Sequence, residues 1–346
     1  EIAQCLVGSE MCIRDRLRHR PGYRRVSPRG KRHEKPCGPV FQYRRRMQTL
    51  GEKTKFQDLY SEKQCSCSEE PIGMDKLNTK YLMNRFDLKP NKALGQNFID
   101  DRGALESIVD GADIDGKGVL EIGAGLGTMT RMLSKRARHV VSVEIDRGLE
   151  QVLSFALEGC DNVTMLFSDF LKCDLSLIHE MLKGETIDVV ANLPYYVTTP
   201  ICMRLLKSGL PIESMTLMLQ SEAAARFFAQ PSCRAYGPLA VISQYQYTAS
   251  KLIDLPPESY YPMPEVESTV VKLTRIHGRE GFNKLCRLCA LVFANRRKTI
   301  QNNLISGGIP REEALAACAQ CGVPPSARAE AIAVDSLAAL AAALFD

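Results

Sequence analysis

Residues 119–128, VLEIGAGLGT, carry an apolar run directly into three closely spaced glycines and form the most informative stretch of this 346-residue chain. Glycine lets a backbone turn sharply and approach a ligand at a distance where a Cβ atom would collide. Glu144 lies 21 residues beyond Gly123, at the end of the next predicted strand. Nucleotide-binding α/β folds place there the carboxylate that holds ribose hydroxyls. Gly123, Gly125, Gly127 and Glu144 are therefore predicted to bind a nucleoside.

The glycine spacing also indicates which kind of nucleoside is bound. It is GxGxG rather than the GxGxxG of dinucleotide sites, and no glycine stands where a pyrophosphate would approach the helix. We therefore expect a nucleoside cofactor without phosphates. Asp169, at the end of a later predicted strand, is placed to accept a hydrogen bond from the adenine amino group of such a cofactor. Taken alone, either Glu144 or Asp169 could be a solvated strand end.

Short apolar runs, separated by segments with helical spacing, extend outward from the glycine motif. The predicted strands are residues 118–122, 139–146, 163–169, 187–192 and 215–220. This alternation indicates βαβ units and a parallel sheet covered on both faces. Beyond about Arg275 the pattern becomes helical, with helices expected over residues 281–304, 311–321 and 335–345. We therefore expect an α/β domain over residues 80–275 and a small helical domain over residues 276–346.

Residues 1–79 lack sustained periodicity and are rich in Arg, Pro, Gly, Ser and Gln, which is typical of disorder. Residues 1–46 hold 13 Lys or Arg against four Asp or Glu, a net charge of +9, so the rest of the chain carries −4 of the total +5. Any RNA surface must therefore be a local patch.

Residues 1–16 resemble translated sequencing-adapter sequence, with Met47 or Met74 as a better start. An RNA-binding arm or an Arg-rich transit peptide is the functional alternative.

Composition narrows the class of protein. The chain is 45% hydrophobic and 25% charged, which is ordinary for a globular protein with a core. No stretch reaches the roughly 18 uncharged apolar residues of a membrane span. The 13 cysteines stand in a long chain without a signal peptide. Reduced thiols in a cytoplasmic protein are therefore expected rather than a disulfide framework.

The tetrapeptide Asn192-Leu193-Pro194-Tyr195 follows a predicted strand at its carboxyl end, where open α/β sheets bind ligands. It suits chemistry at an exocyclic adenine amine, whose lone pair is delocalised into the ring. Hydrogen bonds from this amine to the Asn192 side-chain oxygen and the Leu193 carbonyl would favour a pyramidal nitrogen. Pro194 stiffens the turn, and Tyr195 can stack on the base and hold it in line with a methyl sulfonium. No general base is required, because the proton becomes acidic once the nitrogen is alkylated.

From about Lys92 to the C-terminus, the sequence resembles the ribosomal RNA adenine dimethyltransferases of the KsgA type. Besides the two motifs above, the matching segments are ALGQNFIDD at 93–101, residues 219–244, PPESYYPMPEVESTVVKL at 256–273 and ANRRKTIQNNL at 294–304. The resemblance implies a class I methyltransferase fold, Rossmann-like with a seven-stranded, mainly parallel sheet, and a C-terminal helical RNA-binding domain. It also implies four methyl transfers from S-adenosylmethionine to two adjacent adenosines near the 3′ end of small-subunit rRNA. A monomer would do this during ribosome biogenesis.

The resemblance also implies roles for individual residues in the cofactor site. The residues expected to bind the cofactor are Gln96, Asn97, Ile99, Gly123, Gly125, Gly127, Glu144, Asp169 and Asn192. The first three would close the pocket around the methionine end of the cofactor. Asn192 would also contact the substrate amine, and no metal is implied.

On the substrate side, an adenine inside a helix is unreachable, so the enzyme would act on an unstacked or flipped base. Tyr195 would stack on one face of this base and Tyr260 on the other, although Tyr261 is adjacent and equally aromatic. The residues expected to contact RNA phosphates are Arg296, Arg297 and Lys298. A solvated helix end is the structural alternative for these three.

Three other functions remain open. An antibiotic-resistance methyltransferase of large-subunit rRNA would share the fold and chemistry, but that group usually carries isoleucine where this chain has Leu193. A non-catalytic relative that binds nucleic acid is disfavoured by the intact tetrapeptide 192–195. Cys286-x-x-Cys289 and Cys318-x-x-Cys321 have the form of two zinc knuckles. Cys289 falls in an apolar helical stripe, however, so a core role is favoured and no metal is expected.

Overall fold

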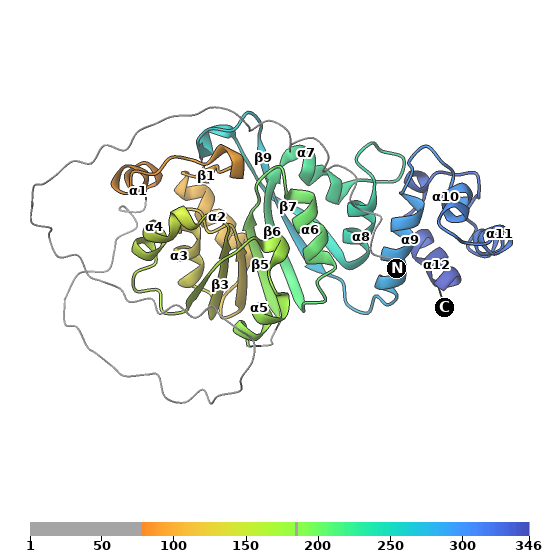
Figure 1. The fold of residues 1–346 in the computed structure, drawn as a ribbon, viewed down its shortest axis with the longest axis horizontal. Helices are drawn as coiled ribbons and strands as arrows, with labels where there is room; N and C mark the ends of the chain where they lie inside the picture. Colours follow the sequence, from red (N-terminus) through yellow and green to blue (C-terminus); the bar gives the residue numbers. More distant parts are fainter. Residues whose placement is uncertain (1–77, 184–185, 346) are drawn as a thin grey trace, which may run out of the picture. The chain divides into compact units, whose positions relative to one another are not determined.

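The computed structural model describes residues 78–183 and 186–345. The leader predicted over residues 1–79 therefore lies outside the described residues except for its last two, and so do the candidate starts Met47 and Met74. From α1 (Thr79–Arg85) onward, helices and strands alternate as far as β9 (Ser268–Arg275), and only helices follow (Figure 1). This order agrees with the predicted α/β segment followed by a helical segment.

The central element is a seven-stranded sheet. Besides β9, its strands are β2 (Gly118–Ile122), β3 (His139–Glu144), β4 (Val163–Phe167), β5 (Ile187–Asn192), β6 (Ile212–Gln220) and β7 (Tyr247–Leu255). Their order in the sheet is β4-β3-β2-β5-β6-β9-β7. The five neighbouring strands β4, β3, β2, β5 and β6 are parallel to one another. β9 runs antiparallel to both of its neighbours, β6 and β7. The resemblance implied this seven-stranded, mainly parallel sheet, and the structure confirms it.

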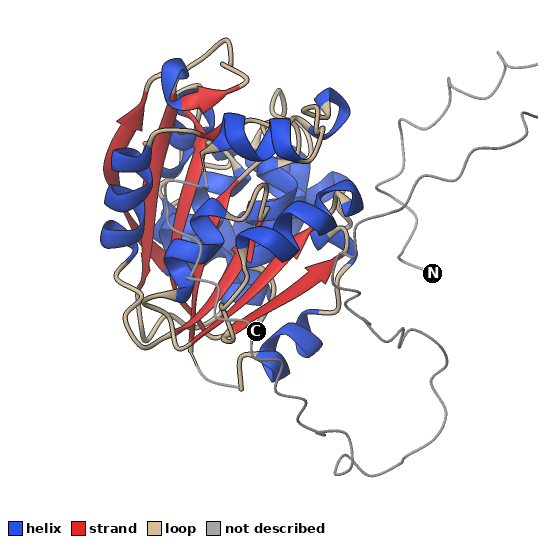
Figure 2. Ribbon diagram, turned by 90° about the vertical axis from the view of Figure 1, so that its left-hand side faces the viewer, coloured by secondary structure: helices blue, strands red, loops and turns tan. Residues whose placement is uncertain are grey.

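Helices cover both faces of the sheet (Figure 2), because the strands of a parallel sheet are buried on both sides. In β2, Val119 belongs to one buried cluster and the next residue, Leu120, to the other. The first cluster includes α2 (Arg102–Ala112) and α3 (Thr128–Ser134). The second includes α5 (Leu175–Met181), α6 (Thr198–Leu206) and α8 (Pro238–Gln246). The remaining elements of this part are α4 (Glu150–Ala156), α7 (Ser221–Ala224) and the two-stranded pair of β1 (Phe98–Ile99) and β8 (Tyr260–Tyr261).

The helices after β9 are α9 (Phe282–Val292), α10 (Ile300–Ser306), α11 (Arg311–Gln320) and α12 (Val334–Phe345). The single helix predicted over residues 281–304 was therefore wrong. The side chain of Asn303 is buried and donates hydrogen bonds to the carbonyls of Val292 at 2.7 Å and Asn295 at 3.0 Å. Thr299 starts the second helix, because its hydroxyl accepts the N–H of Asn302 at 3.3 Å. Both interactions stabilise a turn between α9 and α10.

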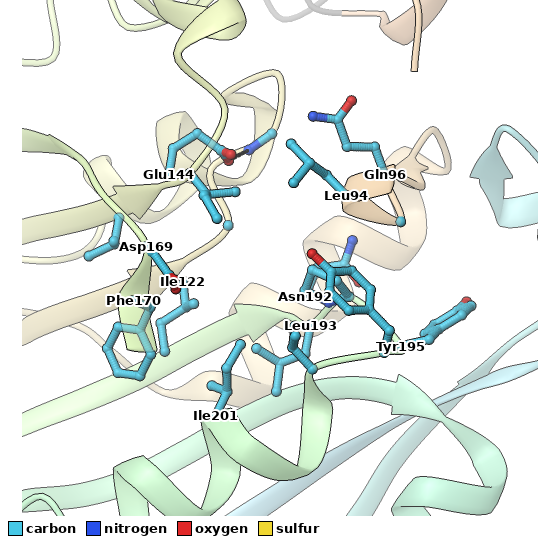
Figure 3. A pocket seen from close by; sticks show the side chains of 18 of the residues that line it. Leu94, Gln96, Ile122, Glu144, Asp169, Phe170, Asn192, Leu193, Tyr195 and Ile201 are labelled. Atoms are coloured by element: carbon cyan, nitrogen blue, oxygen red, sulfur yellow. Dashed lines mark hydrogen bonds between the residues drawn. The ribbon is translucent and has the colours of Figure 1, made fainter. Parts of the chain in front are cut away.

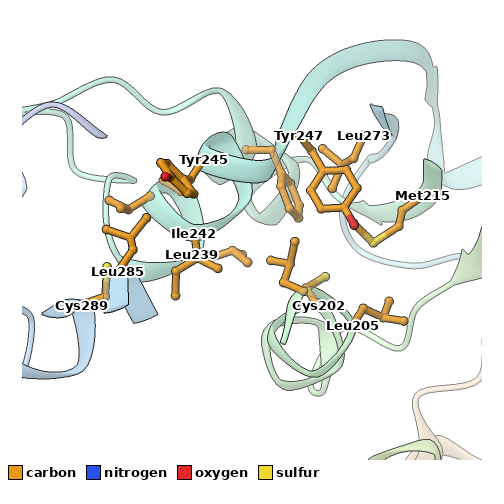
Figure 4. Packing of buried hydrophobic residues seen from close by; sticks show 14 of the residues in the cluster. Cys202, Leu205, Met215, Leu239, Ile242, Tyr245, Tyr247, Leu273, Leu285 and Cys289 are labelled. Carbon is orange, nitrogen blue, oxygen red and sulfur yellow. The ribbon is translucent and has the colours of Figure 1, made fainter. Parts of the chain in front are cut away.

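The predicted domain boundary at residue 275 coincides with the end of β9, but the hydrophobic core continues across it. Leu285 and Cys289 of α9 belong to the same buried cluster as Leu239 of α8 and Cys202 of α6 (Figure 4). The helical segment therefore packs as an extension of the α/β core. No helix within the described ranges is both long and apolar enough to cross a membrane.

Candidate active site

A cavity of about 230 Å³ opens at the carboxyl ends of β2, β3 and β5 (Figure 3). β3 lies on one side of β2 and β5 on the other, and open α/β sheets bind ligands where the strand order reverses in this way. The predicted site residues that line the cavity are Gln96, Asn97, Gly123, Gly125, Glu144, Asp169, Asn192, Leu193, Pro194 and Tyr195. Five separate segments of the chain therefore meet at one site.

Two glycines after β2 keep the floor of the cavity open. Gly123 (φ +85°) and Gly125 (φ +55°) have the left-handed backbone that favours glycine. A Cβ atom on Gly123 would lie 3.3 Å from the Asn192 carbonyl oxygen, and one on Gly125 would lie 3.1 Å from the Phe98 ring. Any larger residue would strain this loop and crowd the wall of the cavity.

Glu144 ends β3 and is 5% exposed. Its Oε2 atom accepts the N–H of Gly125 at 3.0 Å, and Oε1 accepts the N–H of Asp146 at 2.8 Å. Burial raises the pKa of Glu144, while these backbone hydrogen bonds act in the opposite direction. Each carboxylate oxygen keeps a further lone pair. Glu144 can therefore brace the glycine loop and accept hydrogen bonds from ribose hydroxyls at the same time.

Asp169 follows β4 and begins a short 3-10 helix, η4 (Phe170–Lys172). Its Oδ1 atom accepts the N–H of Leu171 at 2.9 Å, and its carboxylate lies 3.5 Å from the exposed ammonium of Lys172. An exposed ion pair of this kind is weak. Asp169 can therefore accept a hydrogen bond from an adenine amino group beside the ring of Phe170.

The charge of the cavity suits a cationic nucleoside. Glu144 and Asp169 line it, and among the described residues no Lys or Arg does. Two carboxylates favour a positive ligand and disfavour a phosphate. Apolar side chains such as Ile122, Val143 and Phe170 supply much of the remaining wall. The residues present therefore fit S-adenosylmethionine, which carries a sulfonium and no phosphate.

Residues 91–97 form a lid beside the cavity and contain the 3-10 helix η2 (Lys92–Leu94). The Gln96 side chain donates to Asp146 Oδ2 at 2.7 Å and accepts the N–H of Asn91 at 2.8 Å. The backbone of Gly95 packs closely against the ring of Tyr196. A Cβ atom added to Gly95 would lie only 3.2 Å from that ring. The lid is therefore attached to the loop after β3 and to the segment after β5.

Asn192 and Leu193 present two hydrogen-bond acceptors at the end of β5. The side-chain nitrogen of Asn192 donates to the Asn97 carbonyl at 3.1 Å, which leaves its Oδ1 atom as an acceptor at the cavity. The N–H of Leu193 donates to the Met218 carbonyl at 3.2 Å, and its side chain is buried. Within the described ranges, no hydrogen bond is made to the Leu193 carbonyl oxygen. Both oxygens can therefore receive the hydrogens of a substrate amine.

The turn after Leu193 is rigid. The carbonyl of Pro194 accepts the N–H of Val197 at 3.2 Å and the hydroxyl of Thr198 at 3.1 Å. The ring of Tyr195 lines the cavity, and its hydroxyl lies 3.0 Å from the hydroxyl of Ser268 on β9. Burial raises the pKa of Tyr195. The ring is therefore neutral and well placed to stack on a base in the cavity.

Three predicted site residues do not line the cavity. Ile99 and Tyr260 pair across β1 and β8 and are buried in the hydrophobic core. Tyr260 is 4% exposed, and its hydroxyl has no hydrogen-bond partner. Gly127 starts α3, where a Cβ atom would lie 3.1 Å from Ala156 and from Leu153 of α4. All three residues pack against neighbouring parts of the chain, outside the set that lines the cavity.

The three predicted RNA-contacting residues lie in the turn between α9 and α10, because the expected continuous helix is broken there. Arg296 pairs with Glu330 at 2.9 Å, Lys298 donates to Ser306 at 3.0 Å, and the side chain of Arg297 is exposed. A second cavity, of about 650 Å³, lies beside this turn. The basic residues that line it are Arg226, Arg234 and Arg296. Glu222 also lines it, so this cavity has three arginines against one glutamate.

Sequence reasoning missed Glu121, the residue of β2 that precedes the glycine loop by two positions. It is fully buried, and its Oε2 atom accepts hydrogen bonds from Thr130 at 2.7 Å and Ser142 at 2.6 Å. Burial raises the pKa of Glu121 to about 7. Through these two hydrogen bonds, Glu121 links α3 and β3 to β2, the strand that leads into the glycine loop. A carboxylate inside the apolar run VLEI was the available signal.

Comparison with known proteins shows which family this chain resembles. Residues 87–345 match the model of a family described as ribosomal RNA adenine dimethylase. A Clostridium botulinum (strain Langeland) protein named ribosomal RNA small subunit methyltransferase A is 39% identical over 275 residues, which are 78% of this chain and 99% of that protein. A protein of the same name from Alkaliphilus metalliredigens is 41% identical over 245 residues, which are 68% of this chain and 85% of that protein.

Two solved structures share the fold. A dimethyladenosine transferase from Plasmodium falciparum has a TM-score of 0.60 at 21% identity, over 70% of this chain and 95% of that one. The 23S rRNA methyltransferase ErmE has a TM-score of 0.55 at 25% identity, over 72% of this chain and 100% of that one. The sheet and its helices are therefore a class I methyltransferase fold.

Proposed function

The chain belongs to the ribosomal RNA adenine dimethylase family, and from this premise we propose that it methylates N6 of two adjacent adenosines near the 3′ end of small-subunit (16S) rRNA. The product is N6,N6-dimethyladenosine at both positions. Relatives at 38–41% identity that carry the small-subunit name support this substrate over large-subunit rRNA.

The proposed cofactor is S-adenosylmethionine, which supplies an activated methyl group on its sulfonium. Glu144 would accept hydrogen bonds from its ribose, and Asp169 would accept one from its adenine amino group. Gln96 and Asn97, held in the lid, would close over its methionine end. The two carboxylates and the absence of basic side chains among the described lining residues support this assignment.

The observation that carries the mechanism is the hydrogen bond from the Asn192 side-chain nitrogen to the lid carbonyl of Asn97, at 3.1 Å. It leaves the Oδ1 atom of Asn192 as an acceptor that would face the substrate amine. This oxygen and the Leu193 carbonyl would accept the two N6 hydrogens and localise the nitrogen lone pair. Tyr195 would stack on the adenine and hold that lone pair in line with the methyl group. The surplus proton leaves to solvent, so no side chain need act as a base.

The proposed partner is small-subunit rRNA in an assembling ribosomal subunit, bound by a monomer in the cytoplasm. The exposed side chains of Arg297 and Lys298 support contact with RNA phosphates. The target adenine would have to leave its stack to reach the cavity, because Asn192 and Tyr195 lie inside it.

The deciding experiment measures methyl incorporation into small subunits isolated from cells that lack this modification. Primer extension then locates the modified adenosines. Asn192→Ala should reduce the rate about 100- to 1,000-fold, the usual cost of losing a hydrogen bond that stabilises a transition state. The matched control is Asn283→Ala, which removes an exposed amide on α9 outside the cavity and should leave the rate unchanged.

Two outcomes would contradict the proposal. Primer-extension stops on large-subunit rRNA would assign the enzyme to the resistance class instead. Wild-type protein that binds the RNA without incorporating methyl groups would support a non-catalytic role.

A further inference from the structure

The hydroxyl of Ser268 contacts the catalytic tetrapeptide from a distant part of the chain. Ser268 is the first residue of β9, is 1% exposed and pairs in register with Gln220 of β6 and Leu255 of β7. Its backbone is therefore fixed by both neighbouring strands. Its Oγ atom lies 3.0 Å from the hydroxyl of Tyr195, which is 73 residues away in sequence.

This hydrogen bond restrains Tyr195 at its outer end, while the backbone restrains it at the other. The backbone of Tyr195 lies in the turn closed by the hydrogen bonds of Val197 and Thr198 to the Pro194 carbonyl. A tyrosine side chain bound at both ends cannot change its χ1 rotamer without breaking one restraint. The ring is therefore held in the cavity before any base arrives.

Tyr260 places a third, buried hydroxyl near Ser268. Burial raises the pKa of Tyr260, whereas a hydrogen-bond interaction with the nearby Ser268 hydroxyl lowers it. The Tyr260 hydroxyl nevertheless makes no hydrogen bond of ordinary geometry. A serine hydroxyl has one proton and two lone pairs. The Ser268 hydroxyl can therefore bond to Tyr195, at 3.0 Å, and still interact with Tyr260 in the core.

We propose that Ser268 is a positioning residue for the methyl transfer: its hydroxyl holds the Tyr195 ring in the orientation that stacks on the target adenine. This inference rests on the proposed function for its effect on rate. The restraint on Tyr195 itself exists without RNA. The role of Ser268 is to reduce the conformations that the ring samples before the base binds, which is a contribution of orientation.

The experiment compares Ser268→Ala, Tyr195→Phe and the double variant in single-turnover methyl transfer at saturating S-adenosylmethionine. Each single variant should slow transfer about 2- to 12-fold, the value of one neutral hydrogen bond. The double variant should be no slower than the slower single variant, since both changes remove the same bond. The affinity for S-adenosylmethionine should not change, and Ser268→Thr, which keeps the hydroxyl, should restore the rate.

The matched control is Ser221→Ala. The Ser221 hydroxyl also lies 3.0 Å from a β9 hydroxyl, that of Thr269, and Ser221 does not line the cavity. The Ser221→Ala variant should therefore leave the rate of methyl transfer unchanged. A readout that needs no RNA is the χ1 rotamer of Tyr195, measured from three-bond NMR couplings. This should be single in the wild type and averaged in Ser268→Ala.

Rate losses that multiply in the double variant, or a single Tyr195 rotamer in Ser268→Ala, would refute the positioning role. Wild-type protein that methylates no small-subunit RNA, together with an averaged rotamer in Ser268→Ala, would refute the proposed function. The link between Ser268 and Tyr195 would then still stand.

Discussion

The buried carboxyl group of Glu121 predicts how the stability of this protein depends on pH. Burial raises its pKa from 4.5 to about 7. The folded state therefore binds more protons than the unfolded state between these two values. As a result, the free energy of unfolding falls as the pH rises through the window from about 4.5 to about 7. Glu121→Gln removes this titration and keeps an oxygen that can accept hydrogen bonds from Thr130 and Ser142.

The size of the effect follows from the difference between the two pKa values. At about 1.36 kcal/mol for each pKa unit, it corresponds to about 3 kcal/mol. Glu121 has no solvent exposure, so solvent does not screen this cost. The wild type should lose about 3 kcal/mol of unfolding free energy between pH 4.5 and pH 8 through this group alone. Over the same interval, the unfolding free energy of Glu121→Gln should fall by about 3 kcal/mol less than that of the wild type.

Urea unfolding at half-unit steps from pH 4.5 to pH 8 measures the difference between the two proteins. Other titrating groups cancel, because they are common to both. The matched control is Glu158→Gln, which changes an exposed glutamate after α4 and should follow the wild-type curve. If the curves of wild type and Glu121→Gln stay parallel across the window, the inferred cost of burying the charge is wrong.

Three further changes test the site. Glu144→Gln should weaken S-adenosylmethionine binding about 10- to 100-fold in titration calorimetry, because a charged acceptor for ribose hydroxyls is lost; an unchanged affinity would remove Glu144 from the site. Gly127→Ala should lower the free energy of unfolding by about 1–3 kcal/mol through strain and crowding against α4. Cofactor affinity should be preserved, and its loss in the folded variant would indicate ligand contact instead. Arg297→Ala should weaken RNA binding at all sequences and reduce the slope of log affinity against log salt by about 1. An unchanged slope would exclude a phosphate contact.

Local sequence determined the fold class and many of the residues that line the cavity. The glycines of VLEIGAGLGT, the strand-end acids Glu144 and Asp169 and the tetrapeptide 192–195 all follow strands of a parallel sheet. The carboxyl ends of such strands lie at one edge. Their meeting at one edge follows from the parallel sheet, which the alternating pattern and the family resemblance already indicated, while the structure supplied the strand order. Their chemistry is carried by residue types within each motif, so it could be recognised without the tertiary structure.

Only the tertiary structure decided which neighbouring side chains reach the site. Tyr260 and Tyr261 are adjacent and both aromatic, and the pairing of β8 with β1 turns the first into the core. The bond from Ser268 to Tyr195 joins residues on different strands, and Asn303 breaks the helix expected around Arg296. Each outcome depends on strand register or on a buried hydrogen bond between distant residues. Periodicity reports only which face of its own element a residue occupies, so it could not predict these contacts.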